Sequence, residues 1–344
     1  MKRISTIDYI EKDTVVKATR LSHAIHVHPF YRRIPTPAKR DTITQPHAPW
    51  GLARISHRAR NFADYVYDTS AGQGVRVYVL DTGIRTTHAE FLDDPWELAN
   101  STTTNGTTFF GRSRAIWGAN FVENTPDIDE DGHGTHVAGT IAGRTYGVVK
   151  KATVVAVKVL DKTGSGYMSG LLQGLNWAVS DATKRGVASR SVINMSLGGP
   201  YTQSVNEAVK AATDMGITVI AAAGNDRANA SEYSPASAST AITVGAIGRD
   251  DYKADFSNWG PGVDIFAPGV TIPSAFAEHD NATLMMSGTS MAAPHVAGLA
   301  AYFLAKDNLK GYTEVSRQLL ELATAGVGDK GDAPDRIAYN GNEQ

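Results

Sequence analysis

Five short apolar runs dominate the pattern of hydrophobic and polar positions after residue 70. They are rich in Val, Ile and Ala, and they cover residues 75–80, 152–160, 191–197, 217–223 and 241–247. Apolar runs of this length, bounded by turn residues, are typical of strands buried on both faces. Between them, apolar residues recur every three or four positions at 134–143, 170–183 and 204–215, which predicts helices. The alternation predicts an α/β fold with a mostly parallel central sheet and helices on both of its faces.

The N-terminal 45 residues follow a different pattern. Residues 5–16 predict a short strand, and a linker rich in histidine and proline follows it, with the dibasic pair Lys39-Arg40. We therefore divide the chain into an N-terminal segment, residues 1–45, and a main domain, residues 46–344. Residues 93–111 are rich in Ser, Thr and Asn, and we expect them to form an exposed insertion.

Charge and composition exclude several classes of protein. The 33 Lys and Arg residues nearly balance the 35 Asp and Glu residues, for a formal net charge of −2, so no nucleic-acid partner is expected. Because the chain has no cysteine, disulfides, thiolate nucleophiles and zinc–thiolate sites are excluded. No apolar run approaches the ~18 residues that span a bilayer, so no membrane partner is expected, and no signal peptide is visible.

Polar residues that follow predicted strands are candidates for chemistry, because parallel sheets bind ligands beyond the carboxyl ends of their strands. Asp81 ends the run 75–80 and is either a turn residue or the partner of a functional group. His133 and His136 stand at a helix start, where the positive helix end favours a neutral imidazole. These three residues are also plausible metal ligands, but the H-E-x-x-H pattern is absent. We interpret His136 as a buried structural histidine.

Ser290 is the third candidate. It is flanked by small residues at the entry to an apolar helix, a position that suits either an N-cap or a nucleophile whose attack creates an oxyanion. Ala292 follows two positions later, so the G-x-S-x-G elbow of α/β-hydrolases is absent.

Taken together, the three candidates occur in the order Asp, His, Ser. The chain carries Asp81-Thr82-Gly83, then HGTHVAG at 133–139, then GTSMAAPHVAG at 288–298. These motifs, in this order, resemble the three signatures of the subtilisin family of serine endopeptidases (peptidase S8), and the chain is most similar to its proteinase K branch. The resemblance spans about residues 46–339 and implies the three-layer subtilisin-like fold.

The resemblance also implies a role for each candidate. Ser290 would attack the peptide carbonyl, His133 would take its proton, and Asp81 would orient the imidazole. Asn225, in the sequence AAAGN at 221–225, would donate a hydrogen bond to the oxyanion.

Substrates of this family add an extended strand between two exposed segments. Here the matching residues are Gly164, Ser165, Gly166 and Tyr167 on one side, and Ser196, Leu197, Gly198 and Gly199 on the other. Together with Ala222, Ala223 and Gly224, the second segment would form the pocket for the side chain before the cut. These residues carry no charge, so we expect broad specificity with an apolar or aromatic preference in that pocket.

The resemblance implies no cofactor for catalysis but a structural Ca²⁺. Its ligands would be the backbone carbonyls of Ser239 and Ala241 and the carboxylate of Asp264. Residues 5–16 resemble the last strand of the inhibitory propeptide of these enzymes, so the N-terminal segment is expected to be a remnant of that propeptide and a partner of the main domain.

The sequence thus predicts a monomeric serine endopeptidase, secreted or vacuolar, that acts on polypeptides through an acyl-enzyme. The alternative is an inactive relative that only binds peptides.

Overall fold

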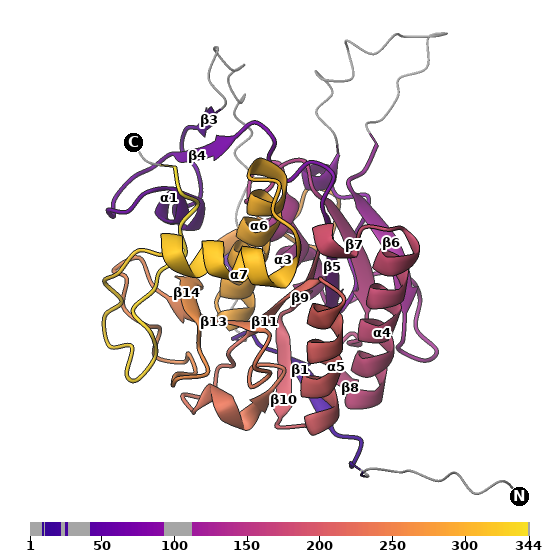
Figure 1. Cartoon of the computed structure of the whole chain (residues 1–344). Coiled ribbons are helices and arrows are strands. Elements are labelled where there is room, and N and C mark those ends of the chain that lie inside the picture. The colour runs from indigo at the N-terminus through magenta and orange to yellow at the C-terminus, as the bar shows by residue number, and fades with distance from the viewer. Residues whose placement is uncertain (1–8, 10, 22–24, 27–41, 93–111, 343–344) are drawn as a thin grey trace, which may run out of the picture.

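The computed structural model describes residues 9, 11–21, 25–26, 42–92 and 112–342. A seven-stranded sheet forms its centre, in the order β14-β13-β11-β9-β5-β7-β6, and every neighbouring pair is parallel (Figure 1). The strands are β5 (Arg76–Asp81), β6 (Ala115–Asn120), β7 (Thr153–Lys158), β9 (Ser191–Met195), β11 (Thr218–Ala222), β13 (Ile242–Ile247) and β14 (Ile265–Pro268). The predicted α/β fold with a parallel central sheet is confirmed.

Helices cover both faces of this sheet. α3 (His133–Ala142), α6 (Thr289–Lys306) and α7 (Gly311–Leu322) lie on one face, and α4 (Met168–Lys184) and α5 (Gln203–Asp214) lie on the other (Figure 1). Strand β5 packs against helices on both of its faces, which is why its sequence is an almost continuous apolar run. Val77 and Val79 pack with α3 and α6, whereas Tyr78 and Leu80 pack with α4 and α5.

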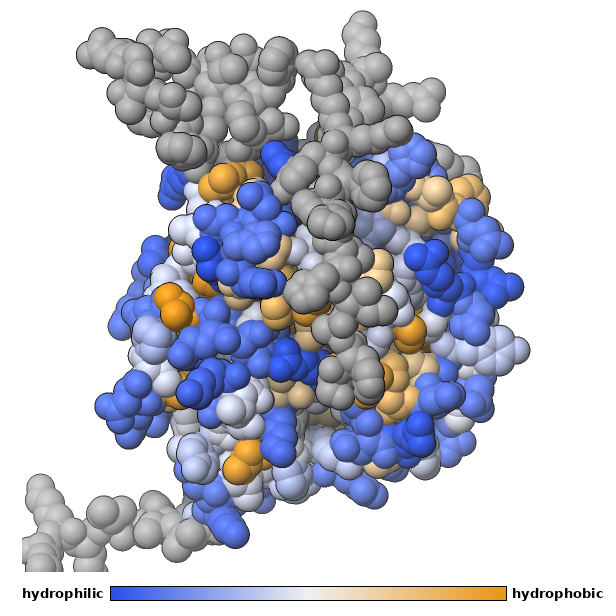
Figure 2. Space-filling view, turned by 180° about the vertical axis from the view of Figure 1, so that it is seen from behind, coloured by the Kyte–Doolittle hydropathy of each residue, from blue (hydrophilic) through white to orange (hydrophobic). Residues whose placement is uncertain are grey.

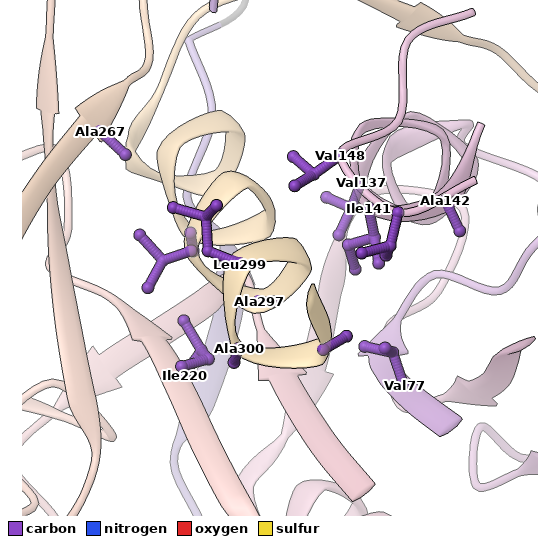
Figure 3. Packing of buried hydrophobic residues seen from close by; sticks show 14 of the residues in the cluster. Val77, Val137, Ile141, Ala142, Val148, Ile220, Ala267, Ala297, Leu299 and Ala300 are labelled. Carbon is purple, nitrogen blue, oxygen red and sulfur yellow. The ribbon is translucent and has the colours of Figure 1, made fainter. Parts of the chain in front are cut away.

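Helix α6 is the centre of the larger apolar cluster. All residues from Thr289 to Leu304 are buried, so this helix is apolar around its whole circumference. Its side chains meet Val137 and Ile141 of α3 and Ile220 of β11 (Figure 3). Ser290, in its first turn, is therefore held on a helix that is packed on all sides.

The predicted elements match the observed ones within a few residues, with two exceptions. The run 191–197 is divided, because β9 ends at Met195 and Leu197 begins β10 (Leu197–Pro200), which belongs to another sheet. The strand expected over 5–16 is wrong for most of its described length: residues 9 and 11–14 form no strand, and the observed strand is β1 (Val15–Ala18). The expected insertion at 93–111 lies outside the described residues.

A second sheet lies beyond the carboxyl ends of the central strands. Its order is β12-β10-β1-β8, with β8 (Ser165–Tyr167) following β7, β10 following β9, and β12 (Tyr233–Ser234) at the edge. β1 is antiparallel to both β8 and β10 and lies between them. A segment of the N-terminal 45 residues thus forms an inner strand of the main domain.

Smaller elements complete the fold. A three-stranded sheet contains β15 (Ile272–Ala275), β16 (Thr283–Met286) and β2 (Ile25–His26), and a two-stranded sheet joins β3 (Thr42–Gln45) to β4 (Tyr65–Asp68). Helix α1 (Trp50–Ser56) is buried along its whole length, and three 3-10 helices complete the list: η1 (Ala89–Phe91), η2 (Ala188–Arg190) and η3 (Ala230–Glu232). Seen from behind, the described surface is mostly hydrophilic with small separate apolar patches (Figure 2). In the described ranges no helix is long and apolar enough to cross a membrane.

Candidate active site

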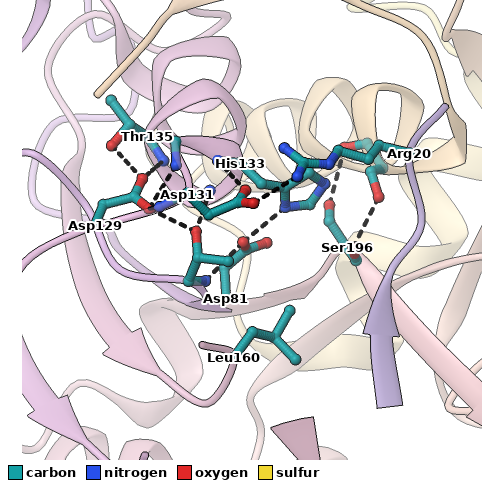
Figure 4. A network of polar contacts seen from close by, with 12 residues as sticks. Arg20, Asp81, Asp129, Asp131, His133, Thr135, Leu160 and Ser196 are labelled. Atoms are coloured by element: carbon teal, nitrogen blue, oxygen red, sulfur yellow. Dashed lines mark hydrogen bonds and ion pairs between the residues drawn. The ribbon is translucent and has the colours of Figure 1, made fainter. Parts of the chain in front are cut away.

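Asp81 and His133 form a buried pair where β5 ends and α3 begins. Asp81 Oδ1 lies 2.7 Å from Nδ1 of His133, and both side chains are completely shielded from solvent (Figure 4). The same oxygen accepts the backbone N–H of Thr82 at 2.8 Å. Because the carboxylate accepts, Nδ1 carries the hydrogen in this pair, and Nε2 is the nitrogen that can act as a base. His133 Nε2 has no hydrogen-bond partner within the described part of the chain.

The loop before α3 is held by a second buried acid, Asp129. Its carboxylate accepts hydrogen bonds from the Thr82 hydroxyl at 2.8 Å, from Gly132 N at 2.8 Å, and from both N and Oγ1 of Thr135 at 2.9 and 2.6 Å. Burial raises the pKa of Asp129, and these donors oppose that shift. Asp129 thus ties the end of β5 to the start of α3. Asp129 was not among the predicted site residues, although its place in the run D-E-D-G-H-G at 129–134 was a signal.

His136 is structural, as the sequence suggested. Its Nε2 lies 3.0 Å from the carbonyl oxygen of Ile272 and 3.1 Å from that of Leu284, and burial lowers its pKa to about 3. The ring is therefore neutral and ties α3 to the β15–β16 hairpin. In the described ranges no group of three His, Cys, Asp or Glu side chains is placed to hold a metal.

Ser290 lies in the first turn of α6. Its backbone N–H donates to the carbonyl oxygen of Thr19 at 3.1 Å. Its hydroxyl donates to the carbonyl oxygen of Ser196 at 2.8 Å and lies 2.5 Å from the Thr19 hydroxyl. No hydrogen bond joins Ser290 to His133 in the residues that the structure describes. Turning the hydroxyl away from Ser196 requires only a change of rotamer about the Cα–Cβ bond.

Asn225 follows β11 and lies beside the start of α6. Its Oδ1 accepts from the backbone N–H and the hydroxyl of Thr289, both at 3.0 Å, which fixes the orientation of the amide. Its Nδ2 is buried, and none of the described residues accepts a hydrogen bond from it. A Cβ placed on Gly288 would lie 3.3 Å from this Nδ2 and 2.5 Å from the Thr19 carbonyl oxygen. Two donors, Ser290 N and Asn225 Nδ2, therefore lie near one carbonyl oxygen.

Strand β1 occupies the cleft between the two segments that the sequence singled out. Val16 pairs with Gly166 and Lys17 with Ser165 on one side, and Lys17 pairs with Gly198 on the other. The ladder continues past the strand: Ala18 N donates to Gly164 O at 2.9 Å, and Thr19 N donates to Ser196 O at 3.2 Å. The sequence analysis did not foresee that these residues would fill the cleft.

Val16 anchors β1 on the apolar face of this sheet. Its side chain is completely buried in the cluster that contains Leu160, Met168 and Leu197, whereas Val15 points outward and is 44% exposed. A Cβ on Gly199 would lie 2.9 Å from Val15 O, so the glycine allows the close approach of the two backbones.

Two acids that precede β1 cap helices of the main domain. Glu11 accepts from the backbone N–H groups of Gln203 and Ser204, at 2.7 and 3.0 Å, at the start of α5. Asp13 accepts from the N–H and hydroxyl of Ser169, at 3.0 and 2.7 Å, at the start of α4. The residues preceding these helices, Thr202 and Tyr167, provide no side-chain cap, so the N-terminal segment supplies it.

The residue after Thr19 contacts a carboxylate. Arg20 Nη2 lies 2.5 Å from Oδ2 of Asp131, two residues before His133 (Figure 4). Farther along, Leu21 N donates to Ser287 O at 2.8 Å, and β2 pairs with β16.

The remaining predicted residues line the cleft or lie apart from it. Gly224 N donates to the hydroxyl of Thr289 at 3.1 Å, and Ala222, Ala223 and Gly224 are buried and uncharged. Asp264 lies at the start of β14, where its Oδ2 accepts from Thr243 N at 2.8 Å. Ser239 and Ala241 precede β13, the strand that pairs with β14.

Comparison with known proteins places these features in a family. The model of the subtilase family matches residues 72–341. Subtilisin-like protease 2 of Pseudogymnoascus destructans is 48% identical over 300 residues, covering 87% of this chain and 69% of the relative. Subtilisin-like protease 3 of the same fungus is 45% identical over 336 residues, covering 96% and 77%. The crystal structure of a cold adapted subtilisin-like serine proteinase superimposes with a TM-score of 0.76 at 37% identity, covering 86% of this chain and all of that one.

Proposed function

The chain belongs to the subtilase family and is a serine endopeptidase, and we propose that Asp81, His133 and Ser290 carry out its chemistry. The hydrogen bond from Ser290 N to the Thr19 carbonyl is the observation that carries this proposal, because it holds a peptide carbonyl at the nucleophile. The buried pair of Asp81 and His133 supports it, since the free Nε2 is the base that attack requires.

In the proposed reaction, Ser290 Oγ attacks the carbonyl carbon while its proton moves to His133 Nε2. The oxyanion then accepts from Ser290 N and Asn225 Nδ2. When the C–N bond breaks, the amine leaves with the proton from His133, and an ester to Ser290 remains. Water hydrolyses this ester by the same steps in reverse, and Asp81 stabilises the imidazolium throughout.

We infer the substrate class from β1. An extended peptide takes its place between Gly164–Tyr167 and Ser196–Gly199 and is recognised mainly through its backbone, which supports broad specificity. The pocket of Val16 favours an apolar side chain four residues before the cut bond. The uncharged surroundings of Ala222–Gly224 support an apolar or aromatic preference directly before it.

The N-terminal segment is proposed to be a propeptide that inhibits the enzyme by filling its cleft. Thr19 offers its carbonyl to Ser290, so the bond between Thr19 and Arg20 is the one that self-processing would cut. The division between the propeptide and the main domain then falls at this bond, within the N-terminal 45 residues.

The predicted structural Ca²⁺ is also a proposal. Burial raises the pKa of Asp264, and its hydrogen bond from Thr243 and the charge of Arg336 oppose this shift without cancelling it. A bound cation would offset the remaining cost of burying the charged carboxylate. Asp264 accepts a hydrogen bond from Thr243 N, two residues after Ala241, which supports this proposal, and a set of one carboxylate and two carbonyl oxygens is the kind that Ca²⁺ prefers. The ion would stabilise this edge of the sheet. A secreted enzyme, as proposed from the family resemblance, would meet Ca²⁺ outside the cell.

The test is to express the chain with Ser290 intact and as Ser290→Ala. We expect the first to yield a new N-terminus at Arg20 and, once the cleaved segment has left the cleft, to bind one equivalent of a fluorophosphonate, and the second to stay uncut and unlabelled. A folded wild-type chain that remains uncut and unlabelled would favour the alternative, an inactive peptide-binding relative.

A further inference from the structure

Asp131 is a charged group at the edge of a cleft whose predicted lining is uncharged. Its Oδ1 accepts the backbone N–H of His133 at 3.0 Å, and its own N–H donates to Asp129 at 3.2 Å. The carboxylate is thus fixed in position before any ligand arrives. With Arg20 in place, the Asp131 side chain is only 5% exposed, so an ion pair here is partly shielded from water.

The position of Arg20 relative to the bond to be cut follows from two contacts. Thr19 gives its carbonyl oxygen to Ser290 N, and Arg20 is therefore the residue whose amine would leave. The Arg20 side chain is directed back toward the residues before the cut bond. Gly164 accepts the hydrogen bond of Ala18 N on that side, and a Cβ on Gly164 would lie 3.9 Å from both Arg20 Nη2 and Asp131 Oδ2. The 2.5 Å ion pair is therefore formed by the first residue of the leaving group.

We propose that Asp131 makes this enzyme select substrates with arginine or lysine directly after the cut bond. This inference rests on the proposed function and adds a specificity-determining residue to it. The other contacts of the leaving side in this region, such as Leu21 N to Ser287 O, use the backbone and do not distinguish side chains. A fixed carboxylate paired with a planar guanidinium does distinguish them.

The preference has a kinetic signature. The leaving amine contacts Asp131 only until the C–N bond breaks, so the ion pair affects acylation and is absent during hydrolysis of the acyl-enzyme. Peptides that share one acyl half and differ only after the cut should therefore differ in kcat/KM and share one deacylation rate. A purely structural role for Asp131 would change both steps for all peptides alike.

The experiment uses the active enzyme recovered from the full chain, with peptides that carry Arg, Gln or Glu directly after the cut. We expect kcat/KM to be about tenfold higher for Arg than for Gln, as for one charge-assisted hydrogen bond, and lowest for Glu. Asp131→Asn keeps an oxygen for the His133 N–H and should reduce the Arg-to-Gln ratio to about one. Glu130→Gln, which removes the same charge one residue away, should leave that ratio near ten.

A second measurement is independent of peptide hydrolysis. During turnover of an ester substrate, argininamide and glutaminamide compete with water for the acyl-enzyme, and we expect argininamide to be the better acceptor in the wild type and not in Asp131→Asn. Equal kcat/KM for Arg and Gln peptides in the wild type would overturn the inference while leaving the proposed function intact. A preference for a basic residue at the Ala18 position alone would overturn it as well. Failure to cleave any peptide would instead contradict the proposed function.

Discussion

The register of β1 makes a sharp prediction about Val15 and Val16. Successive residues of a strand point to opposite faces, so a slip of one residue would exchange the buried and exposed valines. Val16 is fully buried and Val15 is 44% exposed. Removing two methyl groups from a buried valine costs about 1.6 kcal/mol in transfer free energy. The cavity left behind adds to this, for a total of up to about 3 kcal/mol.

The assay is inhibition of the active enzyme by a synthetic peptide of residues 11–19, the product of the proposed self-processing. At about 1.4 kcal/mol for each factor of ten, Val16→Ala in the peptide should raise the inhibition constant about ten- to a hundredfold. Val15→Ala is the matched control, because it removes the same atoms from the neighbouring residue, and it should change the constant by about twofold or less.

Two results would refute this reasoning. Equal effects of the two substitutions would show that neither valine is anchored, and a larger effect of Val15→Ala would show the opposite register. Either result would also contradict the position of the Thr19 carbonyl at Ser290, since the same strand pairing sets the register of Val16 and of Thr19.

Three further predictions concern the acyl side and the metal. Replacing Asn225 by Ala should lower kcat about 10²–10³-fold with little change in KM, a loss known from subtilisin, a relative, and a KM effect alone would contradict its role at the oxyanion. The side chain and backbone of Ser204, with the Gln203 N–H, lower the pKa of Glu11, so its contribution to peptide binding is present above its ordinary value of 4.5 and is lost as the pH falls. The inhibition constant of the wild-type peptide should therefore rise more steeply toward acid pH than that of the Glu11→Gln peptide, and parallel curves would contradict the cap. A Ca²⁺ chelator should lower the Tm of the wild type but not that of Asp264→Asn. Equal shifts in Tm for both proteins would contradict the proposal that Asp264 binds the ion.

The fold could be predicted from the sequence because its central strands are buried on both faces. The run 217–223, for example, consists of Val, Ile and Ala except for Thr218, and a glycine stands at each end. The hydrophobic pattern predicted strands less well where one face of the strand is exposed, or where one apolar run continues from one sheet into another. Residues 191–197 read as one strand because nothing in their hydrophobicity marks Ser196, where the chain leaves the central sheet for β10.

The motifs around Asp81, His133, Asn225 and Ser290 could be recognised because each is a run of adjacent residues in the sequence. Arg20 and Asp131 could not be paired from the sequence, since 111 residues separate them and neither belongs to a periodic pattern. The two helix caps from Glu11 and Asp13 were hidden for the same reason. Tyr167 before α4 has no suitable side chain for an N-cap, but Thr202 before α5 has one, so the sequence does not indicate that both caps come from the N-terminal segment.

The N-terminal segment makes more contacts with the main domain before the bond between Thr19 and Arg20 than directly after it. Before the cut bond, the segment has two backbone ladders, the buried Val16 and the caps from Glu11 and Asp13. After it, the described contacts are the Arg20 ion pair, the Leu21 hydrogen bond and the short pairing of β2 with β16. Cutting the proposed bond would leave the acyl-side contacts in place, so we expect the new carboxyl end to remain beside Ser290. We therefore expect the cleaved segment to act as a product inhibitor until it dissociates or is degraded.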